Sequence, residues 1–121
     1  MAHGKRVLGV DASPYMADLA KKRNIDTIVS LFNSETVKEI VSEYGHPQLV
    51  VANNVYNHID LPIDFTQAVA ELLAPNGTFV FESPYWCVGI QNIKFDQIYH
   101  EHVSYFTVRS VAKMLDMAGL I

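Results

Sequence analysis

The chain has 121 residues, of which 50% are hydrophobic and 18% are charged, a composition typical of one globular domain and not of a disordered or fibrous chain. The formal net charge of −4, with only 9 Lys and Arg, excludes a basic surface that follows a nucleic-acid backbone. The lone Cys87 excludes an internal disulfide and a cysteine-clustered zinc site, so we expect a cytoplasmic protein. No apolar run approaches the roughly 20 residues of a membrane helix, and we expect no membrane partner.

The N-terminal third predicts a strand, a helix, a second strand and a second helix. Residues 7–10 form a short apolar run, and Ser13-Pro14 supplies an N-cap followed by proline. Residues 26–30 predict the second strand, and a helix then runs from Ser34 to a stop at Gly45. The inward-facing residues of the two helices are predicted to be Met16, Leu19, Ala20, Val37, Ile40, Val41 and Tyr44.

The middle of the chain predicts a third strand, a helix and a fourth strand. Residues 49–52 are fully apolar, and a polar run at 53–60 follows them. Pro62 begins a helix, which the turn residues 74–77 end before an apolar strand at 78–81. The residues of this helix that share one apolar face are Phe65, Ala68, Val69, Leu72 and Leu73.

Residues 83–106 show no clear periodicity, although they are rich in aromatic side chains. A stretch of that length inside a small domain is usually functional or disordered, and the aromatic content argues against disorder. The last predicted element is a helix capped by Thr107 and ended by Gly119, with Val111, Leu115 and Ala118 inward.

The order of these elements predicts an α/β fold. Apolar strands that alternate with helices favour a mostly parallel sheet covered on both faces, and right-handed crossovers make the fold a Rossmann-like three-layer sandwich. No linker divides the chain, so residues 1–121 are predicted to form a single domain.

Ligands of such folds bind beyond the carboxyl ends of the strands. Asp11 there accepts ribose hydroxyls or forms a turn before Ser13, with similar weight for each role. Phe32 covers an adenine face or, more commonly, packs in a core. Asn54 belongs to a run of amides that suits turns as well as ligands, and His58 is more often structural than functional at such a place.

The segment Tyr99-His100-Glu101-His102 places four proton-donating or proton-accepting side chains side by side between aromatic neighbours. Burial would move their pKa values toward the range in which acid–base catalysis is efficient. The spacing is not that of a helical zinc site, and we predict no metal. A hydrogen-bonded core network is the alternative reading.

The stretch from Phe95 to Thr107 resembles the signature of S-adenosylmethionine-dependent C-methyltransferases that act on nucleotide-bound keto-deoxysugars. The segments 54–58 and 72–82 resemble the same enzymes, so the similarity runs from about Val7 to the end. It implies a class I methyltransferase fold, S-adenosylmethionine as cofactor and a nucleotide-sugar substrate.

The resemblance also implies roles for individual residues. Asp11 holds the cofactor ribose, and Tyr99, Glu101 and His102 line the sugar site. His102 is the base that removes the proton beside the sugar ketone, Glu101 orients it, and Tyr99 holds or protonates the enolate oxygen. Phe32, Asn54 and His58 complete the candidate cofactor site.

Two features of that family are not found in this sequence. The first strand with its glycine-rich loop and the cysteine-rich zinc-binding region have no counterpart, so we expect an apparently truncated domain whose unaided cofactor binding and activity are uncertain. A sheet that lacks a strand has an unpaired edge, which predicts a dimer or larger homo-oligomer.

Two other function classes remain open. A Rossmann-like remnant that acts as a non-catalytic binding or assembly module would keep the same segments. A nicotinamide-dependent oxidoreductase needs a Gly-x-Gly-x-x-Gly turn, which this sequence does not contain.

Overall fold

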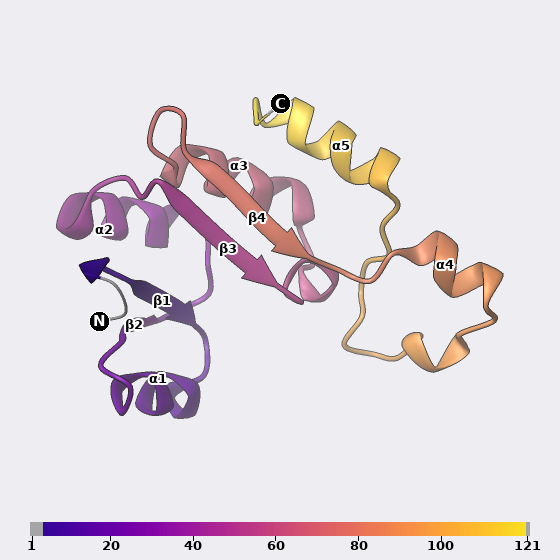
Figure 1. Ribbon diagram of the computed structural model, residues 1–121, viewed down its shortest axis with the longest axis horizontal. Coiled ribbons are helices and arrows are strands. Elements are labelled where there is room, and N and C mark those ends of the chain that lie inside the picture. The colour runs from indigo at the N-terminus through magenta and orange to yellow at the C-terminus, as the bar shows by residue number, and fades with distance from the viewer. Residues whose placement is uncertain (1–3, 121) are drawn as a thin grey trace.

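The computed structural model describes residues 4–120, in which parallel strands alternate with helices (Figure 1). The strands are β1 (Leu8–Asp11), β2 (Asp26–Val29), β3 (Leu49–Asn53) and β4 (Thr78–Glu82). The helices are α1 (Pro14–Lys21), α2 (Ser34–Tyr44), α3 (Pro62–Leu72), α4 (Trp86–Gln91) and α5 (Val108–Met117), with 3-10 turns η2 (Tyr56–His58) and η3 (Phe95–Gln97). The predicted α/β class and parallel strand pairing are confirmed.

Local capping chemistry places the ends of the helices where the sequence predicts them. The side chain of Ser13 accepts a hydrogen bond from the Met16 amide at the start of α1, and Thr107 caps α5 through the Ser110 amide. Gly45 ends α2 with a φ of 79°, a conformation that costs glycine little.

The strands do not form the single sheet that the sequence predicted. β1 pairs with β2 and β3 pairs with β4, and within residues 4–120 no strand pairing joins β1 to β3. The two pairs are connected by one apolar cluster, in which Val37 and Ile40 of α2 and Ala68 of α3 contact Val10 and Val50. Helix packing therefore holds together two sheets that share no hydrogen-bonded edge.

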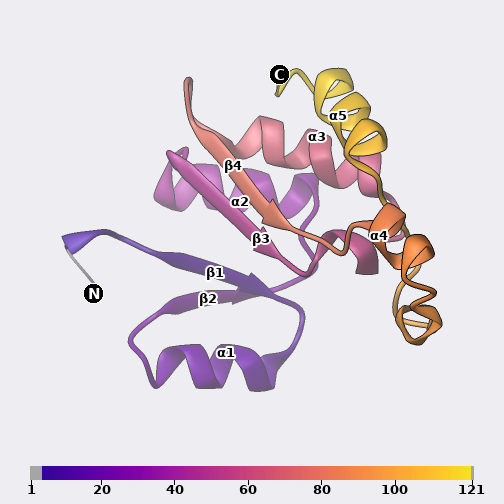
Figure 2. The same ribbon diagram turned by 45° about the vertical axis from the view of Figure 1, so that its right-hand side comes forward.

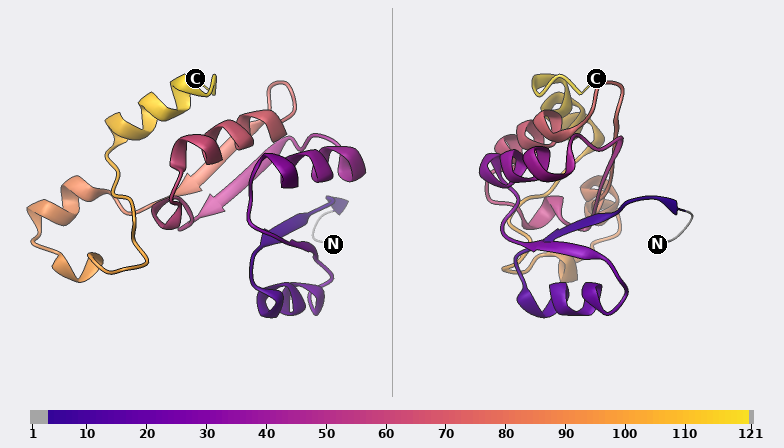
Figure 3. Two further views of the ribbon diagram at one scale, coloured as in Figure 1. Left: turned by 180° about the vertical axis from the view of Figure 1, so that it is seen from behind. Right: turned by 90° about the vertical axis from the view of Figure 1, so that its left-hand side faces the viewer.

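The expected coverage of the sheet on both faces is also wrong for β3 and β4. Burial alternates along both strands, and Val51 and Val80 are exposed. Helices α2 and α3 lie behind these strands and leave the other face open (Figures 1 and 3). A three-layer sandwich needs cover on that face, which the helices among residues 4–120 do not supply.

Helix α1 packs on β1 and β2 through only part of its predicted apolar face. Leu19 and Ala20 are half-buried, whereas Met16, which was expected to point inward, is exposed. The helix has 8 residues, so a narrow stripe suffices for its contact with the two strands.

The main core is centred on Tyr56, which is fully buried although it lies in a run that the sequence showed only as polar. Its ring lies 5.1 Å from Phe81, 5.3 Å from Phe65 and 5.5 Å from Phe106 between ring centroids. Its hydroxyl donates to Thr66, whose own hydroxyl donates to the Pro62 carbonyl. The segment after β3 is thereby anchored in the core.

The stretch 83–106, expected to be irregular, contains α4 and η3. Helix α4 has six residues and no side-chain cap, so it left little signal in the sequence. A parallel bridge between Tyr85 and Phe106 ties the two ends of the stretch together. The arrowheads of all four strands point toward the side on which α4 lies (Figure 2), so this excursion stands at the carboxyl ends of the strands.

No helix among residues 4–120 combines the length and the apolar character needed to cross a bilayer.

Candidate functional site

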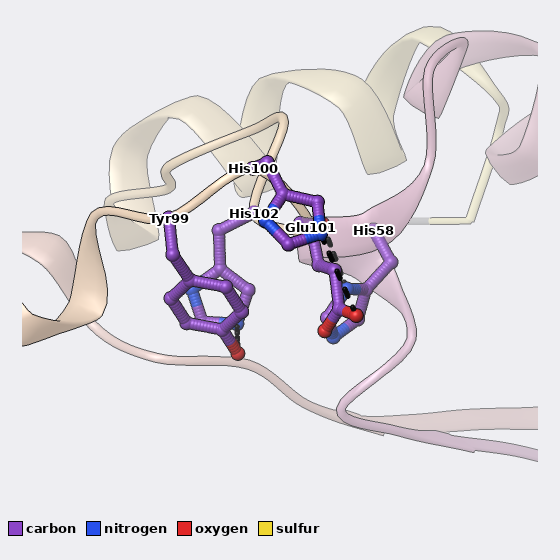
Figure 4. A network of polar contacts seen from close by, with 5 residues as sticks. All are labelled: His58, Tyr99, His100, Glu101 and His102. Carbon is purple, nitrogen blue, oxygen red and sulfur yellow. Dashed lines mark hydrogen bonds and ion pairs between the residues drawn. The ribbon is translucent and has the colours of Figure 1, made fainter.

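The Tyr99 hydroxyl and the His102 imidazole form a hydrogen-bonded pair (Figure 4). His102 Nδ1 lies 2.9 Å from the Gln97 carbonyl oxygen, so this nitrogen carries the proton that it donates. Nε2 is then the acceptor, and the Tyr99 hydroxyl donates to it at 2.7 Å. The backbone of η3 therefore sets the tautomer of His102.

The two members of this pair differ in exposure. His102 is 9% exposed and Tyr99 is 41% exposed. Their rings pack with centroids 4.1 Å apart. The enclosed His102 imidazole therefore accepts a hydrogen bond from an accessible hydroxyl. Such an imidazole can take up a proton from a bound molecule and return it, which is the behaviour of a general acid–base group.

The resemblance had implied that Glu101 orients His102. In the structure the Glu101 carboxylate makes no such contact. It lies 3.9 Å from His100 Nε2, and both side chains extend into solvent, 62% and 90% exposed respectively. No hydrogen bond joins Glu101 to the His102 ring in the described part of the chain. The Gln97 carbonyl takes this orienting position because the turn of η3 brings it next to Nδ1.

The segment after β3 forms hydrogen bonds with the backbone of residues 101–104. His58 Nδ1 donates to the Glu101 carbonyl at 2.8 Å, and the Asn57 carbonyl accepts from the amides of Val103 and Ser104 at 2.9 and 3.2 Å. The Asn57 amide donates to His58 Nε2 at 3.3 Å. The ring centroids of His58 and His102 are 4.9 Å apart, so His58 lies beside the Tyr99–His102 pair.

Of the remaining cofactor candidates, Asp11 and Asn54 lie at strand ends. Asp11 is exposed at the end of β1, and its Oδ1 accepts from the Ser13 amide at 2.8 Å, the turn contact that the sequence allowed. Asn54 has a φ of 54° and donates to the Glu82 carboxylate at 3.2 Å, which ties the ends of β3 and β4 together. Asp11 Oδ2 makes no hydrogen bond within residues 4–120 and is available to a ligand.

Phe32 takes the core position that was the more common alternative. Its ring packs edge-on against Phe65 with centroids 5.1 Å apart, and it contacts both apolar clusters. We therefore do not assign Phe32 to an adenine contact.

A cavity of about 340 Å³ lies beside the pair, with His102 in its wall. Trp86 and Tyr105 form an aromatic side, with ring centroids 4.5 Å apart, and Asn57 and Gln97 also line the cavity. Within the described residues, no three His, Cys, Asp or Glu side chains gather in a way that would hold a metal ion.

Two residues of this site were not identified from the sequence. Gln97 acts through its backbone carbonyl, so its residue type carries no signal. Asn57 was one of several asparagines that suit a turn, and only its burial, at 3% exposed, sets it apart.

Comparison with known proteins places these residues in context. Residues 1–120 match the methyltransferase domain family. Over 117 residues the chain is 37% identical to C-methyltransferase NovU of Streptomyces niveus, a match that covers 97% of this chain and 28% of that protein. The chain thus spans less than a third of the length of this relative.

Proposed function

Because the chain belongs to the methyltransferase domain family, we propose that it takes part in methyl transfer from S-adenosylmethionine to a carbon atom of a nucleotide-linked keto-deoxysugar. The observation that carries the proposal is the Tyr99–His102 pair beside a cavity of suitable size. The name of the similar protein, a C-methyltransferase, agrees with transfer to carbon.

His102 is the base in the proposed reaction. A ketone acidifies the neighbouring C–H group, and His102 Nε2 carries the lone pair that accepts its proton. The C–H electron pair forms the carbon–carbon double bond, and the carbonyl π pair moves onto the oxygen to give an enolate. The Tyr99 hydroxyl, which leaves Nε2 when the substrate binds, donates a hydrogen bond to the oxygen on which the enolate charge develops.

Glu101 has a different role from the one that the resemblance implied. Its carbonyl is held by His58, so the residue fixes the path of the chain beside His102. Its exposed carboxylate faces His100 and has no part in the proton transfer. The positioning of the base belongs to Gln97 and His58.

S-adenosylmethionine, when bound, supplies an electrophilic methyl group on a sulfonium sulfur. The free Oδ2 of Asp11 suits the hydroxyl groups of its ribose, because a carboxylate accepts hydrogen bonds and this one is accessible at a strand end. Asn54 and His58 lie after the adjacent strand β3 and complete the candidate set.

The free edges of β1 and β3 lead us to propose self-association through a sheet edge. Each strand is paired on one side only within residues 4–120. Unpaired strand edges present backbone donors and acceptors to other chains. A second copy is the partner that we propose for them.

Hydrogen exchange at the carbon next to the ketone tests the proposed function without methyl transfer. The protein is incubated in heavy water with a nucleotide-linked 4-keto-6-deoxyglucose, and the loss of the proton signal is followed by NMR. Wild-type protein should accelerate the exchange, and His102→Gln should abolish the acceleration. Wild-type protein that leaves the exchange rate unchanged would favour the non-catalytic binding module.

A further inference from the structure

The cavity beside His102 differs in charge from the chain as a whole. Among residues 4–120, its lining includes one permanently charged side chain, that of Lys94, and no Asp or Glu. The whole chain has 13 Asp and Glu against 9 Lys and Arg, for a formal net charge of −4. A cavity whose wall carries a cation and no carboxylate favours an anionic ligand.

The Lys94 side chain is free to meet such a ligand. It is exposed, and within residues 4–120 it makes no ion pair. A lysine ammonium is carried on a flexible hydrocarbon stem, so it can turn toward a ligand in the cavity without leaving another partner. No carboxylate in the described part of the chain therefore competes with a bound anion for this ammonium.

The backbone places Lys94 at the cavity wall through a turn at the end of α4. The Lys94 amide donates to the Gly89 carbonyl at 2.9 Å, and Gly89 lines the same cavity. Ile93 makes the turn with a φ of 53°, a left-handed conformation that is rare for a β-branched residue. The chain thus reverses at Ile93 and returns Lys94 to the side of α4 that borders the cavity.

We propose that the Lys94 ammonium binds the diphosphate of the nucleotide sugar whose ring lies beside His102. The inference rests on the proposed function, since it concerns the same substrate in the same site. The diphosphate is joined to the anomeric carbon of the sugar, so it lies close to the ring that the cavity holds. An ammonium group donates charge-assisted hydrogen bonds to phosphate oxygens. Lys94 is thus a residue for substrate binding and takes no part in the proton transfer.

The hydrogen exchange assay with a nucleotide-linked 4-keto-6-deoxyglucose tests the inference when the rate is measured against substrate concentration. Lys94→Met keeps the stem and removes the charge, and it should raise KM about tenfold while kcat stays within about twofold of wild type. Lys94→Arg restores the charge and should return KM to within about threefold of wild type. Lys113→Met, at an exposed position of α5 outside the cavity, is the matched control and should leave both constants unchanged.

Salt separates a contact between charges from a structural role of Lys94. Raising the ionic strength from about 0.05 M to about 0.5 M screens exposed charges, so the KM of wild type should rise several-fold and that of Lys94→Met should rise less. A purely structural role would give the two proteins the same salt dependence and would lower kcat together with the affinity.

Equal KM values for wild type and Lys94→Met would overturn the inference and leave the proposed function standing. Wild-type protein that accelerates the exchange at no substrate concentration would overturn the proposed function and the inference with it. The cofactor also carries an anionic group, the carboxylate of its methionine part. Weaker binding of S-adenosylhomocysteine by Lys94→Met in calorimetric titration, with an unchanged KM for the sugar, would assign the ammonium to that carboxylate and overturn the inference.

Discussion

The hydroxyl of Tyr99 lies 2.7 Å from Nε2 of His102, and the opposite ring nitrogen is held by the Gln97 carbonyl. Both polar atoms of the imidazole are thus engaged, one by backbone and one by a side chain that a substrate can displace. The pair has a defined direction of proton transfer, because Nδ1 is a donor and only Nε2 can accept a proton once a substrate displaces Tyr99.

Removal of the base should have the largest effect on turnover. We expect His102→Gln to lower the rate of methyl transfer by about 10²- to 10⁴-fold, the range for general acid–base groups. Tyr99→Phe removes the donor to the enolate oxygen and should cost about 10²-fold. Rates are measured with radiolabelled S-adenosylmethionine and a nucleotide-linked keto-deoxysugar.

Glu101→Gln tests whether the Glu101 carboxylate orients His102, as the resemblance implied, or takes no part in the reaction, as its position in the structure indicates. Since the Glu101 carboxylate is exposed and faces His100, we expect a rate within about tenfold of wild type. His100→Gln is the control and should behave similarly. A loss as large as that of His102→Gln would contradict the position of Glu101 described above.

Asp11→Asn should weaken cofactor binding. The substitution removes the charge from the one carboxylate that we place on the ribose, and we expect about tenfold weaker binding of S-adenosylhomocysteine in calorimetric titration. Asp26→Asn, at the opposite end of the same strand pair, is the matched control. Undiminished affinity of the Asp11 variant would remove Asp11 from the cofactor site.

Self-association should depend on the open face and edge of β3. We expect light scattering to give a molar mass twice that of one chain, and Val51→Lys to weaken the dimer by about tenfold or more, because a charge on an edge strand opposes pairing. Leu61→Lys, at a position that is also exposed but lies outside the strands, should leave the mass unchanged. A wild-type protein of single-chain mass at all concentrations would contradict the prediction.

Tyr56 should make stability decrease at alkaline pH. Burial raises the pKa of its hydroxyl above the ordinary value of 10.0, while the hydrogen bond with Thr66 acts in the opposite direction. Between the unfolded and the folded pKa the unfolded state binds fewer protons, so this contribution is complete below about pH 10 and decreases as pH rises further.

Urea unfolding at about pH 8 and about pH 11 measures this dependence. Tyr56→Phe should lose about 1 kcal/mol at the lower pH, for the hydrogen bond with Thr66, and should show a weaker alkaline decrease. Tyr15→Phe, an exposed position on α1, should unfold like wild type. Identical alkaline slopes for wild type and Tyr56→Phe would exclude Tyr56 as the cause.

The path of the chain was predictable wherever the controlling interactions are local. Ser13 and Thr107 cap helices through amides three residues away, and the apolar spacing of α2 and α3 selects their buried faces. The strand-end position of Asp11 and the aromatic segment around Tyr99 and His102 follow from the same local patterns.

The site itself was decided by contacts between distant parts of the chain. The His58 ring meets the Glu101 carbonyl across 43 residues, and a backbone carbonyl rather than the Glu101 side chain orients His102. Every residue type has a backbone carbonyl, so no sequence pattern predicts which carbonyl orients His102.

The sequence by itself determined the order of the four strands and of α1, α2, α3 and α5, the side-chain caps of α1 and α5, and most of the apolar helix faces, because these depend on side chains a few residues apart. Only the tertiary structure decided that the strands form two separate pairs, that one face of β3 and β4 stays open, and that Asn57 is buried beside His102. These features depend on which surfaces meet after the chain has folded back on itself, and that is a property of packing between segments rather than of any one segment.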